Sequence, residues 1–359
     1  MIYREVDILA GQTVADSGTK TIDLDVTEPI TELEALIGVT NGASENDDKT
    51  PQTIVSKIEI VDGGTVYSSL SGQEACGVFF YDAGKYPPHW YSEAASEGQS
   101  VTIPIHFGRF LGDPDYNFNP AALRNPQLKV TWNKDSAHLT NTVTLGVRAK
   151  VLTDQAAASQ CIFTKSVRSF TSASSGDEPT DLPTDYPIRR LLIRPYSTGE
   201  VPASIITNFK LDCDQGKLVV FNISGWGLCE EVEKTFGYAH VRRTLVLDND
   251  DYTETWIGNC FAGSGACKDG GYLVNLWCSG NPKAWSHVVS HAGTGGSDVE
   301  VEALFYGALP ENIFAYQFGR PDDPATWFPA PSFRNVKLIL KQGIASADVS
   351  ILVQQVRGY

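Results

Sequence analysis

The sequence predicts an all-β fold. Short runs rich in Val, Ile, Thr, Tyr and Phe recur along almost the whole chain, separated by turn-forming residues that include 32 Gly and 19 Pro among 359 residues. This pattern is typical of many short strands joined by turns. Helical periodicity sustained over ten or more residues is scarce. The chain is 42% hydrophobic, enough to fill a core, and its length suits two domains of about 150 to 180 residues each.

The charge balance argues against direct binding to nucleic acid. The chain has 28 basic and 43 acidic residues, a net charge of −15, and no segment that gathers Lys and Arg. Contacts between such residues and phosphate dominate sequence-independent binding. No apolar run is long enough to span a membrane, and the N-terminus lacks the pattern of a signal peptide, so we expect synthesis and folding in the cytoplasm. The seven Cys residues are irregularly spaced, so we expect buried thiols.

Five segments of the first half recur in the same order in the second half. Pair by pair they are 54–60 and 205–211, 70–72 and 223–225, 107–109 and 318–320, 124–125 and 334–335, and 143–147 and 349–353. A collinear series of this kind indicates a duplicated architecture. The offset rises from 153 residues at the second pair to 211 at the third, so the second copy holds about 58 extra residues between Cys229 and Phe318.

The repeat divides the chain into two predicted jelly-roll β-sandwiches. The first covers residues 1–155 and the second 186–359, and each has room for about eight strands. Residues 156–185 are poor in apolar residues and contain several Pro, Ser and Gly, so they are predicted to be a surface linker. The extra residues of the second copy, about 230–300, are predicted to form tower-like loops outside the core.

Local patterns predict several elements within the copies. Alternation of apolar and polar residues predicts strands at 101–107, 126–132 and 141–152. Residues 119–125 are predicted to form a single helical turn, with Asn119 as N-cap and Pro at the first position. Residues 329–335 occupy the same place in the second copy.

Two consecutive jelly rolls with a helical turn before a late strand, a linker between them and a large loop in one copy resemble the double jelly-roll major capsid proteins of tailless icosahedral viruses. This lineage includes membrane-containing bacteriophages and the adenovirus hexon. The resemblance rests on architecture and not on a diagnostic motif. It implies a structural protein without enzymatic activity or cofactor, which forms homotrimeric, pseudo-hexagonal capsomers that tile an icosahedral shell.

The same resemblance implies a location and partners. The protein is expected in the virion capsid, assembled in the host cytoplasm. Its expected partners are further copies of itself, neighbouring capsomers, penton and minor capsid proteins, and an internal viral membrane. No direct contact with nucleic acid is expected.

A Phe-Gly-Arg triplet followed by an acidic turn occurs once in each copy. The triplets are Phe107, Gly108 and Arg109, and Phe318, Gly319 and Arg320. The acids are Asp113, Asp115, Asp322 and Asp323. Clustered carboxylates are ligands for Ca²⁺, so calcium is one interpretation. The other is that each Arg pairs with a nearby acid to fix a turn.

Two other functions are compatible with paired sandwiches. A glycan-acting enzyme would use opposed carboxylates such as Asp113 and Asp322, although no nucleophile motif or metal-ligand set is recognisable. A tandem carbohydrate-binding module would use exposed aromatic residues. Trp256, Trp277 and Trp285 lie in the insertion, where they are predicted either to contact a host surface or to pack the tower.

Overall fold

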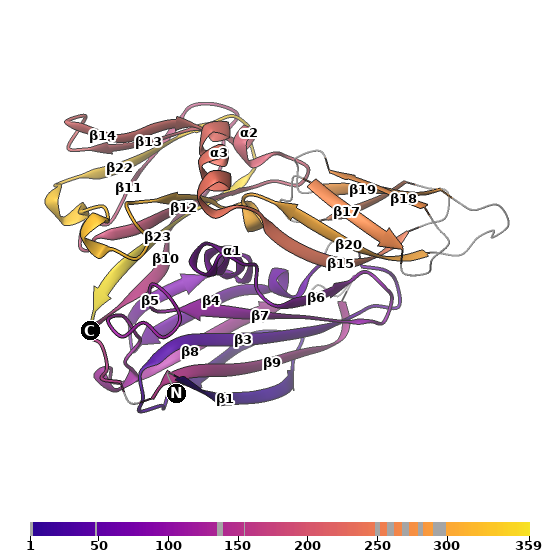
Figure 1. Ribbon diagram of the computed structural model, residues 1–359, viewed down its shortest axis with the longest axis horizontal. Helices are drawn as coiled ribbons and strands as arrows, with labels where there is room; N and C mark the ends of the chain where they lie inside the picture. Colours follow the sequence, from indigo (N-terminus) through magenta and orange to yellow (C-terminus); the bar gives the residue numbers. More distant parts are fainter. Residues whose placement is uncertain are drawn as a thin grey trace.

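The chain folds into two β-sandwiches that lie side by side (Figure 1). The computed structural model describes residues 3–46, 49–134, 139–153, 155–247, 252–256, 262–267, 273–278, 283–289 and 299–359. A continuous hydrophobic core runs through both sandwiches, with Leu33, Phe209 and Ile351 among its fully buried residues. No helix in these ranges is long and apolar enough to cross a membrane.

The first sandwich is a jelly roll of eight strands. One sheet has the order β1-β9-β3-β7 and the other β2-β8-β4-β5. The strands are β1 (Tyr3–Val14), β2 (Ser17–Asp23), β3 (Ile30–Asn41), β4 (Val55–Asp62), β5 (Thr65–Leu70), β7 (Gly98–His106), β8 (Pro126–Asn133) and β9 (Leu139–Leu152). The short strand β6 (His89–Ser92) adds to the outer edge of β7.

The second sandwich repeats this connectivity strand for strand. Its sheets have the orders β10-β23-β12-β21 and β11-β22-β13-β14. The strands are β10 (Gln160–Thr171), β11 (Asp177–Asp181), β12 (Ile188–Tyr196), β13 (Ile206–Cys213), β14 (Leu218–Ser224), β21 (Phe314–Gln317), β22 (Val336–Gln342) and β23 (Asp348–Gly358). The predicted eight strands per copy are therefore present in both halves.

Irregularities of pairing are duplicated as well. A register shift between Asp7 and Leu9 of β1 recurs between Ser166 and Arg168 of β10. The isolated bridge from Ile30 to Phe118 also recurs, as the bridge from Ile188 to Phe328. Bulges bend strands and fix register, so their repetition defines which residues of the two copies are structurally equivalent.

A 12-residue helix follows the fifth strand of each copy, and the sequence did not predict it. The helices are α1 (Gly72–Ala83) and α3 (Gly225–Phe236). Ser71 and Ser224 are the N-caps, and Ser71 forms a capping box with Glu74. Each helix packs against a short helical segment, which is η1 (Pro51–Ile54) in the first copy and α2 (Pro202–Ile205) in the second.

The prediction that residues 156–185 form a surface linker is wrong, because most of this range lies in two strands. Residues 160–171 form β10, which pairs with β23, and residues 177–181 form β11, which pairs with β22. Both strands belong to the second sandwich. Polar residues such as Ser166 and Ser169, on a strand whose other residues include the buried Cys161 and Phe163, gave this stretch the composition of a linker.

The predicted strands of the first copy and the helical turn predicted in each copy are confirmed. β7, β8 and β9 match the three predicted strands, except that β7 ends at His106 and leaves out Phe107, and the turns are the 3-10 segments η2 (Pro120–Ala122) and η5 (Ala330–Ser332). Asn119 is the N-cap residue of η2 and Pro120 follows it, as predicted, but the Asn119 side chain makes no capping hydrogen bond. Two further 3-10 segments, η3 (Pro310–Asn312) and η4 (Pro324–Thr326), flank β21.

The predicted insertion contains strands between α3 and β21. β15 (Ala239–Leu247) and β20 (Val299–Gly307) pair with each other, and β15 also pairs in parallel with β6 of the first copy. The remaining strands are β16 (Tyr252–Trp256), β17 (Ala262–Cys267), β18 (Leu273–Cys278) and β19 (Lys283–Val289). Together they form an extension at one end of the molecule (Figure 1).

Candidate functional site

The first Phe-Gly-Arg triplet forms a loop closed by an ion pair. Nε of Arg109 donates to Oδ2 of Asp113 at 2.7 Å, and Nη2 donates to Oδ1 at 2.7 Å. The same Nη2 donates to Asp115 at 2.6 Å. Asp113 is fully buried, and a Cβ on Gly108 would lie 2.6 Å from its Cβ. The glycine thus allows the carboxylate to approach the backbone and meet the guanidinium.

The second triplet forms a similar but more exposed loop. Nη2 of Arg320 donates to Oδ2 of Asp323 at 2.5 Å, and the Arg320 side chain is 74% exposed. Gly319 has a φ of +59°, and a Cβ there would lie 2.3 Å from the Thr326 carbonyl oxygen, so only glycine fits. The two loops touch, because Nη1 of Arg109 donates to the backbone carbonyl of Asp322 at 3.2 Å.

These contacts are what the ion-pair interpretation of the acidic turns predicts. Burial raises the pKa of Asp113, but the hydrogen bonds from Arg109 outweigh it and hold that pKa below its ordinary value. Within the described ranges, no group of three or more His, Cys, Asp or Glu side chains is placed to hold a metal ion. Calcium binding by Asp113, Asp115, Asp322 and Asp323 stays a prediction.

A buried ion cluster joins the two sandwiches, and the sequence did not predict it. Asp82 of α1 accepts from Nη1 of Arg189 at 2.9 Å and from Nη1 of Arg190 at 2.8 Å. Both arginines belong to β12 of the second sandwich and are at most 1% exposed. Gln354 of β23 donates to the same carboxylate at 3.0 Å. The signal in the sequence was the pair of arginines inside the apolar run IRRLLI, since such residues are buried only when paired.

The cluster is charged at neutral pH. Burial raises the pKa of Asp82, but the guanidinium groups of Arg190 and Arg189 outweigh it and hold that pKa below its usual value. Burial lowers the pKa of Arg189 to about 10, which still leaves it protonated. Removing one member of such a cluster leaves uncompensated buried charge, so the two sandwiches are held in one fixed arrangement.

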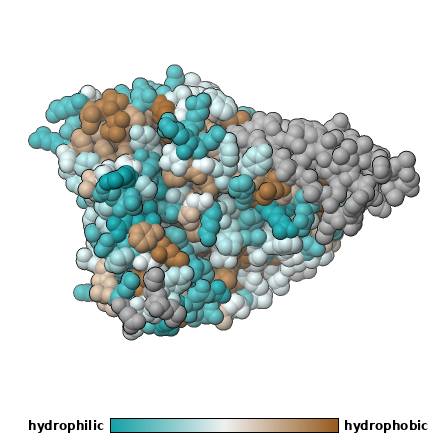
Figure 2. Space-filling view, viewed as in Figure 1, coloured by the Kyte–Doolittle hydropathy of each residue, from teal (hydrophilic) through white to brown (hydrophobic). Residues whose placement is uncertain are grey.

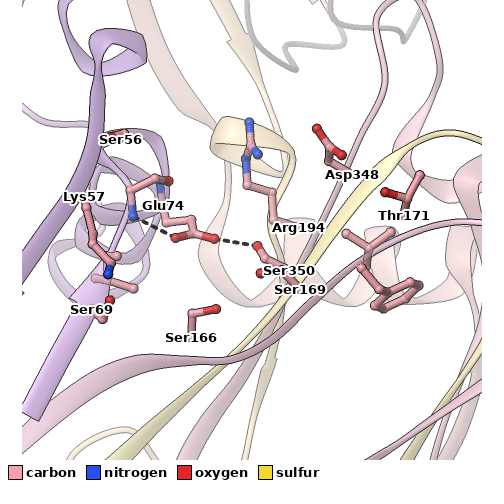
Figure 3. Close-up of a pocket in the computed structure, with 14 residues that line it drawn as sticks. Ser56, Lys57, Ser69, Glu74, Ser166, Ser169, Thr171, Arg194, Asp348 and Ser350 are labelled. Atoms are coloured by element: carbon pink, nitrogen blue, oxygen red, sulfur yellow. Dashed lines mark hydrogen bonds between the residues drawn. The ribbon is translucent and has the colours of Figure 1, made fainter. Parts of the chain in front are cut away.

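A polar groove lies between α1 and the second sandwich (Figure 3). Its volume is about 540 Å³, and serine hydroxyls from β5, β10 and β23 line it. Glu74 links the two copies across the groove. It accepts hydrogen bonds from the backbone NH of Ser71 at 2.8 Å and from the hydroxyl of Ser350 at 2.5 Å. Arg194 donates from Nη2 to the side-chain oxygen of Gln73 at 3.0 Å. The groove is thus another part of the contact between the two copies.

Backbone pairing completes the junction. β5 pairs in parallel with β10 at Ser69 and Lys165, so a sheet of the first sandwich continues into a sheet of the second. The parallel pair of β6 and β15 joins the copies a second time. Figure 1 shows α1 between the two sandwiches, while α3 lies on the outside of the second.

The second sandwich carries several exposed apolar side chains. Trp226 is 55% exposed, and Leu218 and Val219 of β14 are exposed as well. Figure 2 shows hydrophobic residues gathered at the end of the second sandwich where Figure 1 draws β13 and β14. The predicted host-contact residues lie elsewhere: Trp256, Trp277 and Trp285 fall in β16, β18 and β19, and their side chains lie outside the described part of the structure.

No protein-family model matches the chain, and no curated protein matches it either. Several solved structures match the chain in fold. The Sulfolobus turreted icosahedral virus structure gives a TM-score of 0.63 at 9% identity, covering 99% of this chain and 90% of that one. The PBCV-1 virus capsid gives 0.60 at 9% identity, with 99% and 93% covered. The major capsid protein P2 from bacteriophage PM2 gives 0.56 at 9% identity, with 100% of both chains covered.

The chain has the double jelly-roll fold of viral major capsid proteins. The predicted all-β class and the predicted pair of jelly rolls are therefore confirmed. At this level of identity the likeness extends to the backbone and not to particular side chains.

Proposed function

We propose that this protein is a viral major capsid protein that forms homotrimeric, pseudo-hexagonal capsomers in an icosahedral shell. The observation that carries the proposal is the match along nearly the whole length of both chains to the capsid structures of three viruses. A double sandwich with two similar halves gives a threefold assembly six similar corners, which is the shape that tiles a surface.

The junction between the sandwiches supports this role. A tile must keep its two halves at a fixed angle, because small rotations would change how it meets its neighbours. Asp82 with Arg189 and Arg190, the β5–β10 pair and the β6–β15 pair all tie the halves together. The function proposed is therefore a geometric one, in which the chain supplies rigid edges.

The alternative of a glycan-acting enzyme has less support. Asp113 is fully buried and held by Arg109, so its carboxylate does not reach a substrate, and Asp322 contributes its backbone carbonyl to the loop contact. The structures named above are capsid structures. A carbohydrate-binding module would bind glycans as a monomer, which the mass measurement below separates from a capsid tile.

The proposal includes location and partners. The protein would reside in the virion capsid after assembly in the host cytoplasm, beside penton and minor capsid proteins and over an internal viral membrane, without contact to nucleic acid. The extension formed by β15 to β20 would point outward and contact the host. Replacing Trp256, Trp277 and Trp285 together by Ala should then lower virion attachment while the capsomer stays intact.

The direct test is the native mass of the purified protein by light scattering, with and without a calcium chelator. A trimer of 39.0 kDa chains has a mass of about 117 kDa. A stable species of that mass supports the capsomer. A monomer at every concentration contradicts it and favours a glycan-acting protein. Loss of the trimer in chelator would assign calcium to the acidic turns.

A further inference from the structure

The contact between the two halves uses one strand edge from each, and the duplication supplies an equivalent of each of these edges in the other half. Within the chain, β5 of the first copy pairs with β10 of the second. The equivalent of β5 in the second copy is β14, and the equivalent of β10 in the first copy is β1. Among the described strands, β14 and β1 each lie at the end of a sheet. Open strand edges are sites where another chain can add.

The matching bulges give a residue-level register for pairing these edges. In β1 the register shift begins after Asp7, and Val6 is the residue before it. In β10 the same shift begins after Ser166, and Lys165 is the residue before it, so Val6 and Lys165 are equivalent. Asn222 of β14 follows the shift of that strand as Ser69 follows the shift of β5. Pairing β14 with β1 in the manner of β5 with β10 would therefore place Asn222 beside Val6.

One contact within the chain joins two polar side chains, and both equivalent side chains on the proposed docking faces are apolar. Within the chain, Arg194 of β12 donates to Gln73 of α1. The residue equivalent to Arg194 is Leu36 of β3, and the one equivalent to Gln73 is Trp226 of α3. A polar pair is thus matched by an apolar pair. Trp226 is 55% exposed, and a large exposed aromatic side chain of this kind is typical of an interface anchor.

The hydrogen bond between Ser350 and Glu74, next to this pair, also has equivalent residues on the two proposed docking faces. The hydroxyl of Ser350 donates to Glu74 within the chain. The equivalent residues are Gly146 of β9 and Gly227 of α3. Gly146 pairs with Leu36 in the sheet as Ser350 pairs with Arg194. Neither glycine has a side chain that would compete for the space beside the indole of Trp226.

Charges are compatible at the third equivalent contact. Arg190 needs the carboxylate of Asp82, which comes from the other half of the chain. Its equivalent is Glu32, which already pairs with His106 and Lys150 of its own sandwich. The equivalent of Asp82 is the exposed, neutral Thr235 of α3. Docking α3 on β3 would therefore bring no second carboxylate to Glu32.

We propose that α3 and β14 of one copy dock on β1, β3 and β9 of a second copy, in the arrangement that α1 and β5 adopt on β10, β12 and β23 within the chain. Trp226 then packs on Leu36, and Asn222 lies beside Val6. Each copy carries one face of each kind, so the contact is heterologous and closes into a ring of three. This proposal rests on the proposed homotrimer and assigns its interface.

Cysteine cross-linking tests the register. Neighbouring strands lie about 4.8 Å apart, within reach of a disulfide. We expect the double variant Val6→Cys/Asn222→Cys to give covalent dimers and trimers on oxidation, resolved on a non-reducing gel. The matched control is Ser69→Cys/Lys165→Cys, the equivalent pair within the chain, which should give only monomers. Each single variant, which lacks the second introduced thiol, should give no ladder.

Light scattering tests the anchor independently. Trp226→Glu should raise the concentration at which the trimer half-dissociates by about 30-fold or more, as expected for an interface hot spot. Leu36→Glu should act in the same way. Trp90→Glu is the control, because Trp90 is also exposed, at 47%, and belongs to β6, which is not one of the strands of the proposed contact. Unchanged circular dichroism would show that each variant folds.

The outcomes separate this proposal from the proposed function. A trimer that keeps its mass in Trp226→Glu and Leu36→Glu and gives no cross-link from the Val6/Asn222 pair overturns the interface and leaves the capsomer standing. A wild-type monomer at every concentration overturns both. A trimer lost in the two interface variants and kept in Trp90→Glu, together with the covalent ladder, supports both.

Discussion

Helices α1 and α3 are the same element of the repeat in two different surroundings. α1 lies between the two sandwiches, and nine of its twelve residues are buried, including Phe79, Phe80 and Tyr81. α3 lies on the outside, and four of its twelve are buried. The two helices have the same length, the same serine N-cap position and the same cysteine position, so the duplicated fold is not what separates them. What differs is whether the chain itself supplies the second contact face.

This difference shows that the residues needed to form the helix are not the residues needed to join the two sandwiches. The residues shared by the helices are those that begin the helix or face their own sandwich. The residues that differ include Asp82, which contacts β12 of the second sandwich, and its equivalent Thr235, which is exposed. Variants at equivalent positions should therefore have unequal effects.

The largest expected difference is between Asp82→Ala and Thr235→Ala. Removing the Asp82 carboxylate leaves Arg189 and Arg190 buried without their anion, so we expect a loss of about 3–5 kcal/mol in the free energy of unfolding. Thr235 is exposed, so its replacement should cost less than about 0.5 kcal/mol. Urea denaturation followed by circular dichroism measures both. Equal and small losses would show that the cluster does not hold the halves together.

The next comparison is between the two Phe-Gly-Arg loops. Arg109→Ala leaves the fully buried Asp113 without its guanidinium, and we expect a loss of about 2–3 kcal/mol. Arg320→Ala breaks an exposed pair and should cost much less, because solvent screens the interaction. Thermal melting of both variants, with and without added Ca²⁺, is the measurement. If Ca²⁺ raises the melting temperature of the wild type, the acidic turns bind the ion and the loops are more than ion-paired turns.

Glycine substitutions should show where the two helices remain alike. A Cβ on Gly72 would lie 2.4 Å from the carbonyl oxygen of Gln52, and one on Gly225 would lie 2.5 Å from that of Ile206. Both neighbours are backbone atoms, so each Gly→Ala change should cost about 2 kcal/mol through a forced shift. The control is Gly64→Ala, because no atom of a neighbouring residue lies within 4 Å of a Cβ added at Gly64. A large loss at Gly72 alone would mean that only α1 needs this close contact with its short helical neighbour.

The sequence predicted the parts of the fold that depend on local patterns. Strands β7, β8 and β9 follow from alternating residues, and the repeat follows from the collinear matches. The last match, 143–147 with 349–353, is two residues out of register, because Gly146 of β9 is equivalent to Ser350 of β23 in the structure. α1 was missed because it is apolar on nearly every side, which removes the helical periodicity that the pattern search depends on. Its available signal was the capping box of Ser71 and Glu74.

The junction could not be predicted because its partners are far apart in the chain. Asp82 and Arg190 are 108 residues apart, and no local pattern connects them. β10 has the composition of a linker because its buried residues are confined to 161–164, near its start, and polar residues further along the strand line the groove. Only the three-dimensional arrangement shows that these segments meet.

The smallest expected effect concerns pH and compares Glu32 with its equivalent, Arg190. Burial raises the pKa of Glu32, but the hydrogen bond and charge of His106, followed by those of Lys150, lower it to about 2. A carboxyl with a lowered folded-state pKa contributes stability above its ordinary value of 4.5, and this contribution is lost as the pH falls toward 2. Between pH 6 and pH 3.5 the loss should be on the order of 1 kcal/mol.

Glu32→Gln isolates this contribution from those of other carboxyl groups. The variant keeps the shape of the side chain but has no proton to gain, so its free energy of unfolding should fall less than that of the wild type over the same pH range. Arg190→Lys is the matched variant at the equivalent position. Its loss of stability should be the same at both pH values, because the change exchanges one cation for another and removes no carboxyl group. If Glu32→Gln and the wild type lose stability in parallel, Glu32 does not carry the acid sensitivity of the first sandwich.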